Sequence, residues 1–210
     1  MAENNYPLII KGELRETPSR ALWLVKWLLL FPHIICLAGL WIAFIVVTVI
    51  AFFAVLFTGT YPRGMFDFNV GVLRWTWRVS FYGYGALATD VYPPFSLEPD
   101  ATYPADLFVE YPEKLSNGLV LVKWLLAVPH YAVLVFLTGF GLRYVYEHVD
   151  FVSGGLLSVL VLIIAIVLLF AKTYIGDIFR LVVGINRWVF RVAAYVFLLT
   201  DEYPPFRFEE

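Results

Sequence analysis

Long stretches without a charged residue dominate the pattern of the chain. The two stretches in the second half cover positions 124–142 and 151–171, and each is close to the roughly 20 apolar residues that a membrane-spanning helix needs. The residues between them, 143–150, are mostly polar or charged. This part of the chain therefore predicts a helical hairpin with its turn at 143–150.

The stretch in the first half covers 36 uncharged positions, 27–62. At about 1.5 Å per residue, a helix of that length would measure about 54 Å, nearly two hydrocarbon cores of about 30 Å. We expect two tight crossings between positions 19 and 58, with a turn near Ala38 and Gly39. A shallow re-entrant hairpin, or one tilted helix preceded by an interfacial helix broken at Pro32, would fit the same length.

The chain contains two copies of one pattern. The offset between matching positions is 97 early in the pattern and 113 later, so repeat two carries 16 extra residues between His130 and Tyr174. Added equally to both arms of a hairpin, these residues would lengthen it and leave the fold unchanged. We expect repeat one at 1–100 and repeat two at 101–210. The matching blocks include Val25–Leu29 with Val122–Leu126, Pro32–His33 with Pro129–His130, Arg74–Trp75 with Arg187–Trp188, and Thr89–Phe95 with Thr200–Phe206.

The last part of each repeat predicts an amphipathic helix, at 66–88 and at 178–199. One face carries arginines at helical spacing, and Phe, Trp, Val, Leu and Tyr fill the others. Arginine at the bilayer centre is costly, so we expect these helices to lie in the interface with their arginines directed to water. There the arginines could meet lipid phosphates without specificity, dock a partner subunit or a particular anionic lipid, or line a water-filled path for anions. The candidate lipid- or partner-binding residues are Arg74, Arg78, Arg187, Arg191, Trp75 and Trp188.

Short alternating segments open and close each repeat, at 7–13, 95–98, 105–110 and 206–209. An alternation of apolar and polar residues is typical of strands. If both hairpins return to the same side of the membrane, the four segments meet at the cytoplasmic surface, where a small sheet is expected. Four extended tails on the lipid headgroups are the alternative.

Composition narrows the class of protein. Hydrophobic residues make up 61% of the chain and charged residues 15%, and the mean hydropathy is +0.78. Soluble domains contain about 45–50% apolar and about 25% charged residues, so we do not expect a water-soluble globular protein. The net charge of −2 argues against nucleic acid as a partner, and the single cysteine, Cys36, excludes a disulfide framework. The expected fold is an all-α integral membrane protein, with two tandem repeats of helical hairpin plus amphipathic interfacial helix and short extended segments at the cytoplasmic surface.

Basic residues give the expected orientation. Four basic residues precede the first apolar stretch: Lys11, Arg15, Arg20 and Lys26. By the positive-inside tendency, the N-terminal end of that stretch lies on the cytoplasmic side of the membrane. No cleavable signal peptide is expected, because the segment 1–20 is polar. We therefore expect a multi-pass protein with both termini in the cytoplasm.

His33 and His130 occupy equivalent places, each after a proline near the start of an apolar stretch. Paired histidines in a helical bundle can hold haem or a metal ion, and a single histidine can ligate a pigment of a neighbouring protein. The simpler interpretation is that each histidine caps the break that the proline makes in its helix. No companion Asp, Glu or Cys stands at ligand spacing, so we expect no metal site and no resident cofactor.

The sequence carries no Gly-rich phosphate loop, no His-Glu-x-x-His and no Gly-x-Ser-x-Gly, so we do not expect an enzyme. The aromatic content and the arginines favour a structural or accessory subunit that packs against a larger membrane complex or organises its lipids. The alternative is a homo-oligomeric channel or a transporter of small solutes or anions, because internal repeats are common in transporters. The expected partners are membrane lipids, other membrane-protein subunits or a second copy of the chain.

The order of several blocks resembles a known bacterial family. These blocks are Phe57–Gly64, Phe66–Phe68, Leu73–Trp75, Arg78–Val79 and the Thr-Asp-x-Tyr-Pro-Pro-Phe pattern at 89–95 and 200–206. The chain is similar, from about Tyr6 to Phe206, to a family of uncharacterised membrane proteins described as domain of unknown function 4389. Repeat two departs from the pattern at 172–177 and in its 16 extra residues. The resemblance implies an integral protein of the bacterial inner membrane and implies no particular activity.

Overall fold

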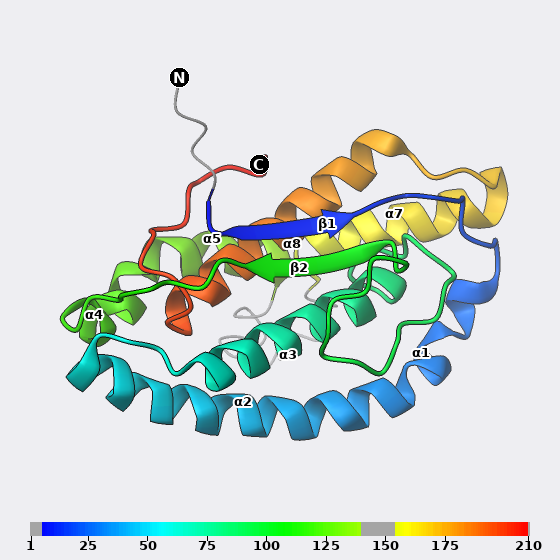
Figure 1. Cartoon of the computed structure of the whole chain (residues 1–210). Coiled ribbons are helices and arrows are strands. Elements are labelled where there is room, and N and C mark those ends of the chain that lie inside the picture. The colour runs from blue at the N-terminus through cyan, green and yellow to red at the C-terminus, as the bar shows by residue number, and fades with distance from the viewer. Residues whose placement is uncertain (1–5, 140–153, 210) are drawn as a thin grey trace, which may run out of the picture.

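A computed structural model describes residues 6–139 and 154–209 and shows two repeats of the same order (Figure 1). Each repeat consists of a strand, short helical turns, a long apolar helix or helix pair, and a second long helix. Repeat one contains β1 (Leu8–Gly12), η1 (Leu22–Leu24), α1 (Lys26–Leu29), α2 (Phe31–Thr58) and α3 (Arg63–Tyr82). Repeat two contains β2 (Ala105–Val109), α4 (Leu119–Leu126), α5 (Val128–Thr138), α7 (Leu156–Ala171) and α8 (Gly176–Val196). The described chain is therefore mostly helical with one small sheet.

The two strands define the approximate symmetry of the chain. They pair antiparallel, with Ile10 opposite Leu107 and Lys11 opposite Asp106. The numbers of Ile10 and Leu107 differ by the repeat offset of 97, so this pair joins equivalent positions of the two repeats. Opposed residues of an antiparallel pair are related by a local two-fold axis. The two repeats are therefore related by an approximate two-fold axis that passes between Ile10 and Leu107.

Each strand packs on a helix of the other repeat. The β2 strand lies against α3, and β1 lies against α8. Tyr103, just before β2, donates its hydroxyl to the carbonyl of Arg78 at 3.4 Å. Its equivalent Tyr6, just before β1, donates to the carbonyl of Arg191 at 3.3 Å. Because the strands are exchanged in this way, neither repeat completes its own core.

The ribbon of strands packs on the inner helices α3 and α8, and the outer helices α2, α5 and α7 pack on those inner helices. The inner helices α3 and α8 contribute large buried side chains, such as Trp77, Phe81 and Phe190. The outer helix α2 runs along α3, and α5 and α7 follow one another along α8. The outer layer is exposed: only 17% of the most apolar 18-residue part of α2 is buried.

The expected hairpin in repeat one is wrong, because α2 is one continuous helix through Ala38 and Gly39. The chain instead bends at Leu30, between α1 and α2. Pro32 lies in the first turn of α2, where a missing amide hydrogen leaves no helical hydrogen bond unmade. Among the described residues, α2 is the helix that by itself is long and apolar enough to cross a membrane, and α4 with α5 would qualify only as one span bent by 42°.

The expected lengthening of both hairpin arms in repeat two is also wrong. α5 ends beside the start of α7, since a Cβ added to Gly155 would clash with the amide nitrogen of Gly139. By the repeat spacings, α5 corresponds to the first part of α2 and α7 to its last part. The 16 extra residues of repeat two are therefore an insertion into the middle of a helix equivalent to α2. The expected turn at 143–150 lies outside the described residues.

Two of the four expected extended segments form the ribbon, and the other two do not join it. The segment 95–98 crosses α3 at Gly71, where an added Cβ would stand 2.8 Å from Cβ of Leu97. The segment 206–209 crosses α8 at Gly184, with the same 2.8 Å distance to Cβ of Phe208. A glycine at each crossing thus lets the tail of a repeat lie directly on its own inner helix.

Deleting residues 140–155 is expected to join α5 and α7 into one helix like α2. Gly139 would then stand where α2 has Ile42, so Gly139→Ile should be combined with the deletion to improve helix propensity. We expect the variant to keep its helical circular dichroism and its unfolding temperature in the same detergent. Deleting 36–51 from α2 is the matched control and should abolish folding. An unfolded first variant would contradict the equivalence of α5 and α7 with α2.

Candidate functional site

Two buried lysines connect the start of each apolar segment with the tail of its own repeat. Lys26 Nζ donates to the carbonyl of Thr89 at 2.7 Å and lies 3.2 Å from Oδ1 of Asp90. In repeat two, Lys123 Nζ donates to the carbonyl of Thr200 at 2.7 Å and lies 2.7 Å from Oδ1 of Asp201. Each lysine is only 1% exposed. The Val-Lys-Trp block and the Thr-Asp block of each repeat therefore form one contact.

Each histidine is enclosed by aromatic side chains from its own repeat. His33 Nδ1 accepts a hydrogen bond from Trp75 Nε1 at 3.0 Å, and the imidazole stacks on Phe95 with 3.9 Å between ring centres. The equivalent His130 accepts from Trp188 at 2.9 Å and stacks on Phe206 at 4.1 Å. Because Nδ1 is the acceptor, the neutral imidazole carries its hydrogen on Nε2. The two histidines lie in separate clusters that share no residue among these contacts.

The expectation that each histidine caps a helix break is wrong in its detail. The carbonyl of Leu29, at the bend before α2, accepts from the hydroxyl of Tyr92 at 2.9 Å. The carbonyl of Leu126 accepts from Tyr203 at 3.1 Å. The tyrosine of the Tyr-Pro-Pro-Phe tail thus satisfies the backbone at the bend, and the histidine packs the tail against the inner helix.

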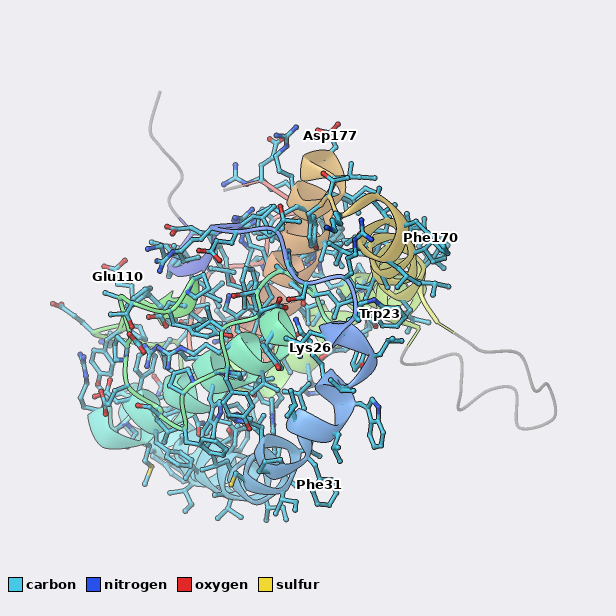
Figure 2. The ribbon with its side chains drawn as sticks, turned by 90° about the vertical axis from the view of Figure 1, so that its right-hand side faces the viewer. Trp23, Lys26, Phe31, Glu110, Phe170 and Asp177 are labelled. Atoms are coloured by element: carbon cyan, nitrogen blue, oxygen red, sulfur yellow. The ribbon has the colours of Figure 1, made fainter. Side chains whose placement is uncertain are left out.

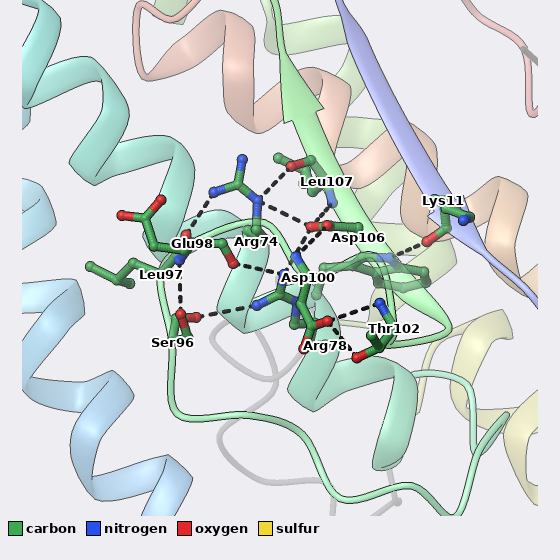
Figure 3. Close-up of polar contacts among 11 residues, drawn as sticks. Lys11, Arg74, Arg78, Ser96, Leu97, Glu98, Asp100, Thr102, Asp106 and Leu107 are labelled. Atoms are coloured by element: carbon green, nitrogen blue, oxygen red, sulfur yellow. Dashed lines mark hydrogen bonds and ion pairs between the residues drawn. The ribbon is translucent and has the colours of Figure 1, made fainter.

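The arginines of α3 face a buried carboxylate and main-chain carbonyls (Figure 3). Arg74 Nε lies 2.9 Å from the carbonyl of Leu107 and 3.1 Å from Oδ1 of Asp106. Arg78 Nη2 lies 3.2 Å from the same carboxylate oxygen and 2.9 Å from the carbonyl of Glu98. Arg78 and Asp106 are almost fully buried. The three side chains fix both the tail and the exchanged strand β2 to α3.

Repeat two uses its equivalent arginines without an equivalent aspartate. Arg187 donates to the carbonyl of Phe208 at 2.8 Å, and Arg191 donates to the carbonyl of Arg207 at 3.2 Å. The guanidinium of Arg191 also lies over the ring of Tyr6, 5.4 Å from its centre. By the repeat spacing, the position of Asp106 is occupied by Ile9 in β1, and Ile9 is exposed. The aspartate of β2 therefore has no counterpart at the equivalent position of β1.

The structure places the predicted site residues at equivalent positions of the two repeats and turns them inward. Arg74, Arg78 and Arg191 are buried, as are Trp75 and Trp188, and Arg187 is half-buried. The arginine stripe thus faces the tails and the ribbon rather than water, because main-chain carbonyls there supply the acceptors. Binding of lipid or partner by these residues stays a prediction.

The sequence reasoning missed the groups that complete these contacts. They are Lys26, Lys123, Tyr92, Tyr203, Phe95, Phe206 and Asp106. All but Asp106 stand in blocks that the two repeats share, so recurrence of a polar or aromatic residue was the available signal. No such signal existed for Asp106.

Two surface hollows lie beside the inner helices at equivalent places. The hollow of α3 measures about 630 Å³ and is lined in part by Arg63, Phe68 and Phe108. The hollow of α8 measures about 470 Å³ and is lined in part by Arg180 and Leu181. Both combine exposed charge with apolar side chains at the edge of the ribbon.

Within residues 6–139 and 154–209, no group of three or more His, Cys, Asp or Glu side chains could hold a metal ion. The Nδ1 atoms of both histidines are engaged by tryptophans. A haem or pigment contact would therefore have to use Nε2.

The Lys26–Asp90 contact predicts a loss of stability in acid. Burial raises the pKa of the Asp90 carboxyl, but hydrogen bonds from Ser19 and the ammonium of Lys26 outweigh burial and hold that pKa below its usual value. A depressed carboxyl pKa contributes stability above the unfolded value of about 3.9, and this is lost as the pH falls through the folded value. Asp90→Asn should cost about 1.5–3 kcal/mol at pH 7 and progressively less below about pH 4.

The measurement is the unfolding free energy in detergent from pH 7 to pH 3. Asp67→Asn is the control, because Asp67 pairs with Arg63 on the surface and should change stability by less than about 1 kcal/mol. A constant difference between Asp90→Asn and the parent at every pH would contradict the expectation.

Replacing the carboxylate shared by the two arginines should be more damaging. Asp106→Asn leaves Arg74 and Arg78 buried without their counter-charge, and removing one partner of a buried ion pair costs about 3–5 kcal/mol. The equivalent substitution Ile9→Asn, on the exposed side of β1, should stay within about 0.5 kcal/mol. Chemical denaturation followed by tryptophan fluorescence measures both, and equal effects would contradict the role of Asp106.

Comparison with known proteins agrees with this repeated architecture. The family described as "Domain of unknown function (DUF4389)" matches residues 20–96 and 148–207. The first segment holds most of repeat one, and the second holds α7, α8 and the tail of repeat two. No curated protein and no solved structure matches the chain. Since the two segments together cover well over half of its length, the chain belongs to the DUF4389 family.

Proposed function

We propose that this protein is a non-catalytic membrane protein of the bacterial inner membrane, acting as a structural or accessory subunit of a larger membrane assembly. The observation that carries the proposal is the outer helical layer. Its exposed side chains are almost entirely apolar, including Ile42, Phe57, Trp124 and Phe170. Exposed apolar surface of this extent is typical of contact with lipid or with another membrane protein.

The use of the buried polar groups supports a non-catalytic role. The buried lysines, the arginines of α3 and the tryptophan-bound histidines all hold segments of the chain together. Catalytic groups are instead expected in a cleft with room for substrate beside them. In the described part of the chain, the buried charges act as fasteners between the tails, the ribbon and the inner helices.

The two hollows at the edges of the ribbon are the proposed points of contact with other subunits. Phe108 projects at the hollow of α3 and is 42% exposed, close to the charged pair Arg63 and Asp67. An aromatic anchor surrounded by charge is typical of protein–protein contacts. The hollow of α8 offers a second version of the same surface.

The alternative of a channel or anion transporter was suggested by the internal repeats, and the arginine stripe would have to line its water-filled path. The stripe lies against main-chain carbonyls and Asp106, so this geometry adds no support to that alternative.

Photo-crosslinking in native membranes tests the proposal. A benzophenone amino acid at Phe108 should crosslink to one or a few distinct polypeptides, which mass spectrometry would identify. The matched control is Tyr84, which is 43% exposed but lies outside both hollows, and it should give no such product. Crosslinks only to a second copy would favour a homo-oligomer, and crosslinks only to lipid would overturn the accessory-subunit proposal.

A further inference from the structure

Most of the large apolar side chains that are exposed lie on the outer layer, which consists of α1, α2, α4, α5 and α7. Figure 2 shows Phe31 of α2 and Phe170 of α7 pointing away from the body, with Glu110 beside the ribbon on the opposite side. Over the described parts of 22–58 and 119–171, the charged residues are Lys26 and Lys123, and both are buried. The exposed surface of these outer segments is therefore uncharged.

Exposed charge is found in the other layers. Lys11 and Glu13 form an ion pair at the end of β1 and just beyond it, with 43% and 45% of their side chains exposed. Arg63 and Asp67 are exposed in the first turns of α3, as are Asp177 and Arg180 in α8. In the described part of the chain, the outer layer thus presents an uncharged surface, and these exposed ion pairs lie at the ribbon and on the inner helices.

The position of the ribbon relative to the length of α2 distinguishes two orientations of the protein. In one, α2 crosses the bilayer; in the other, α2 lies parallel to the membrane plane. Trp41 of α2 donates to Thr76 of α3, and Asn69 of α3 donates to Thr48 of α2. These contacts run antiparallel, so the middle of α2 lies level with Arg74, between Asn69 and Thr76. Arg74 in turn contacts Leu107, the residue at the symmetry axis of the ribbon.

If α2 stood across the bilayer, its middle and the centre of the ribbon would therefore share the mid-plane. Lys11 pairs with Asp106 in the ribbon, one position from that centre, so the exposed Lys11 and Glu13 would lie in hydrocarbon. Charged side chains at that depth are rare and face a protein interior or water. With the layers parallel to the membrane, the same side chains lie in water and the outer layer lies in lipid.

We propose that the protein is monotopic, with its outer layer immersed in one leaflet and α2, α5 and α7 parallel to the membrane plane. The approximate two-fold axis then stands along the membrane normal, so both repeats meet the bilayer equivalently. The equivalent tryptophans Trp27 and Trp124, each 61% exposed, lie on this layer as interfacial anchors. This inference rests on the proposed membrane location and replaces the multi-pass arrangement expected from the apolar stretches.

Spin labels along α2 in proteoliposomes of phosphatidylcholine and phosphatidylglycerol test the orientation. Cys36 is the natural exposed cysteine, and Val46→Cys and Phe57→Cys in a Cys36→Ser background supply the middle and the end. From position 36 to 57 the helix rises about 32 Å, close to the thickness of the hydrocarbon core. Collision with oxygen and with a water-soluble nickel chelate should report similar depths for all three labels, and for Phe170→Cys in α7. Glu110→Cys is the aqueous control.

A depth profile that is deepest at position 46 and shallow at both 36 and 57 would overturn the proposal. Labelling with a membrane-impermeant maleimide gives a second measurement, using Arg20→Cys and Arg63→Cys at the two ends of the α1–α2 segment in the same background. In sealed native vesicles both positions should react from the same side. Reaction from opposite sides would overturn the monotopic arrangement and leave the accessory-subunit proposal intact. Extraction of the membranes with alkaline carbonate is a separate test. Release of the protein by carbonate would contradict both the monotopic arrangement and the proposed membrane location.

Discussion

The antiparallel pairing of Ile10 with Leu107 is the constraint on which the rest of the structure depends. Because the pair joins equivalent residues, it places the two repeats around one approximate axis and leaves each strand against the helix of the other repeat. A two-stranded ribbon by itself is marginally stable in water, so it needs the helices beneath it. The helices need the ribbon equally, since Leu8, Ile10 and Leu107 belong to their common core. The two repeats therefore form one cooperative unit.

The buried lysines and arginines of this unit are stabilised more by hydrogen bonds to main-chain carbonyls than by carboxylates. Lys26, Lys123, Arg74 and Arg78 each donate to at least one main-chain carbonyl of a tail or of the ribbon. Hydrogen bonds from charged donors are stronger than neutral ones, so they offset part of the desolvation of the buried charge. The same bonds tie an otherwise irregular tail to the core. Buried charge in this fold thus orders chain segments that hydrophobic packing alone would leave loose.

The two repeats have diverged where the common pattern did not constrain them. Asp106 neutralises two arginines in one repeat, whereas Ile9 stands at the equivalent place in the other. The 16 extra residues of repeat two enter between Gly139 and Gly155, two buried glycines that lie against one another where α5 ends and α7 begins. Each hollow beside an inner helix likewise keeps its position but changes its lining residues. These differences give the two sides of a nearly symmetric molecule distinct surfaces.

The sequence by itself determined the repeats, the apolar segments, the long helices after them and the family. Each of these follows from local periodicity or from matching blocks, which need no knowledge of distant contacts. Only the tertiary structure decided that α2 is a single helix, since a charge-free run such as 27–62 has the same composition whether it turns or continues. It also decided that the arginines face inward, because the carbonyls that accept their hydrogen bonds come from segments well outside the inner helix in sequence. The pairing of Lys26 with Asp90 and of His33 with Phe95 likewise arises from chain folding, and residue types alone do not encode it. The role of Asp106 could not be predicted from the sequence for the same reason, because it arises only when β2 packs against the helix of the other repeat.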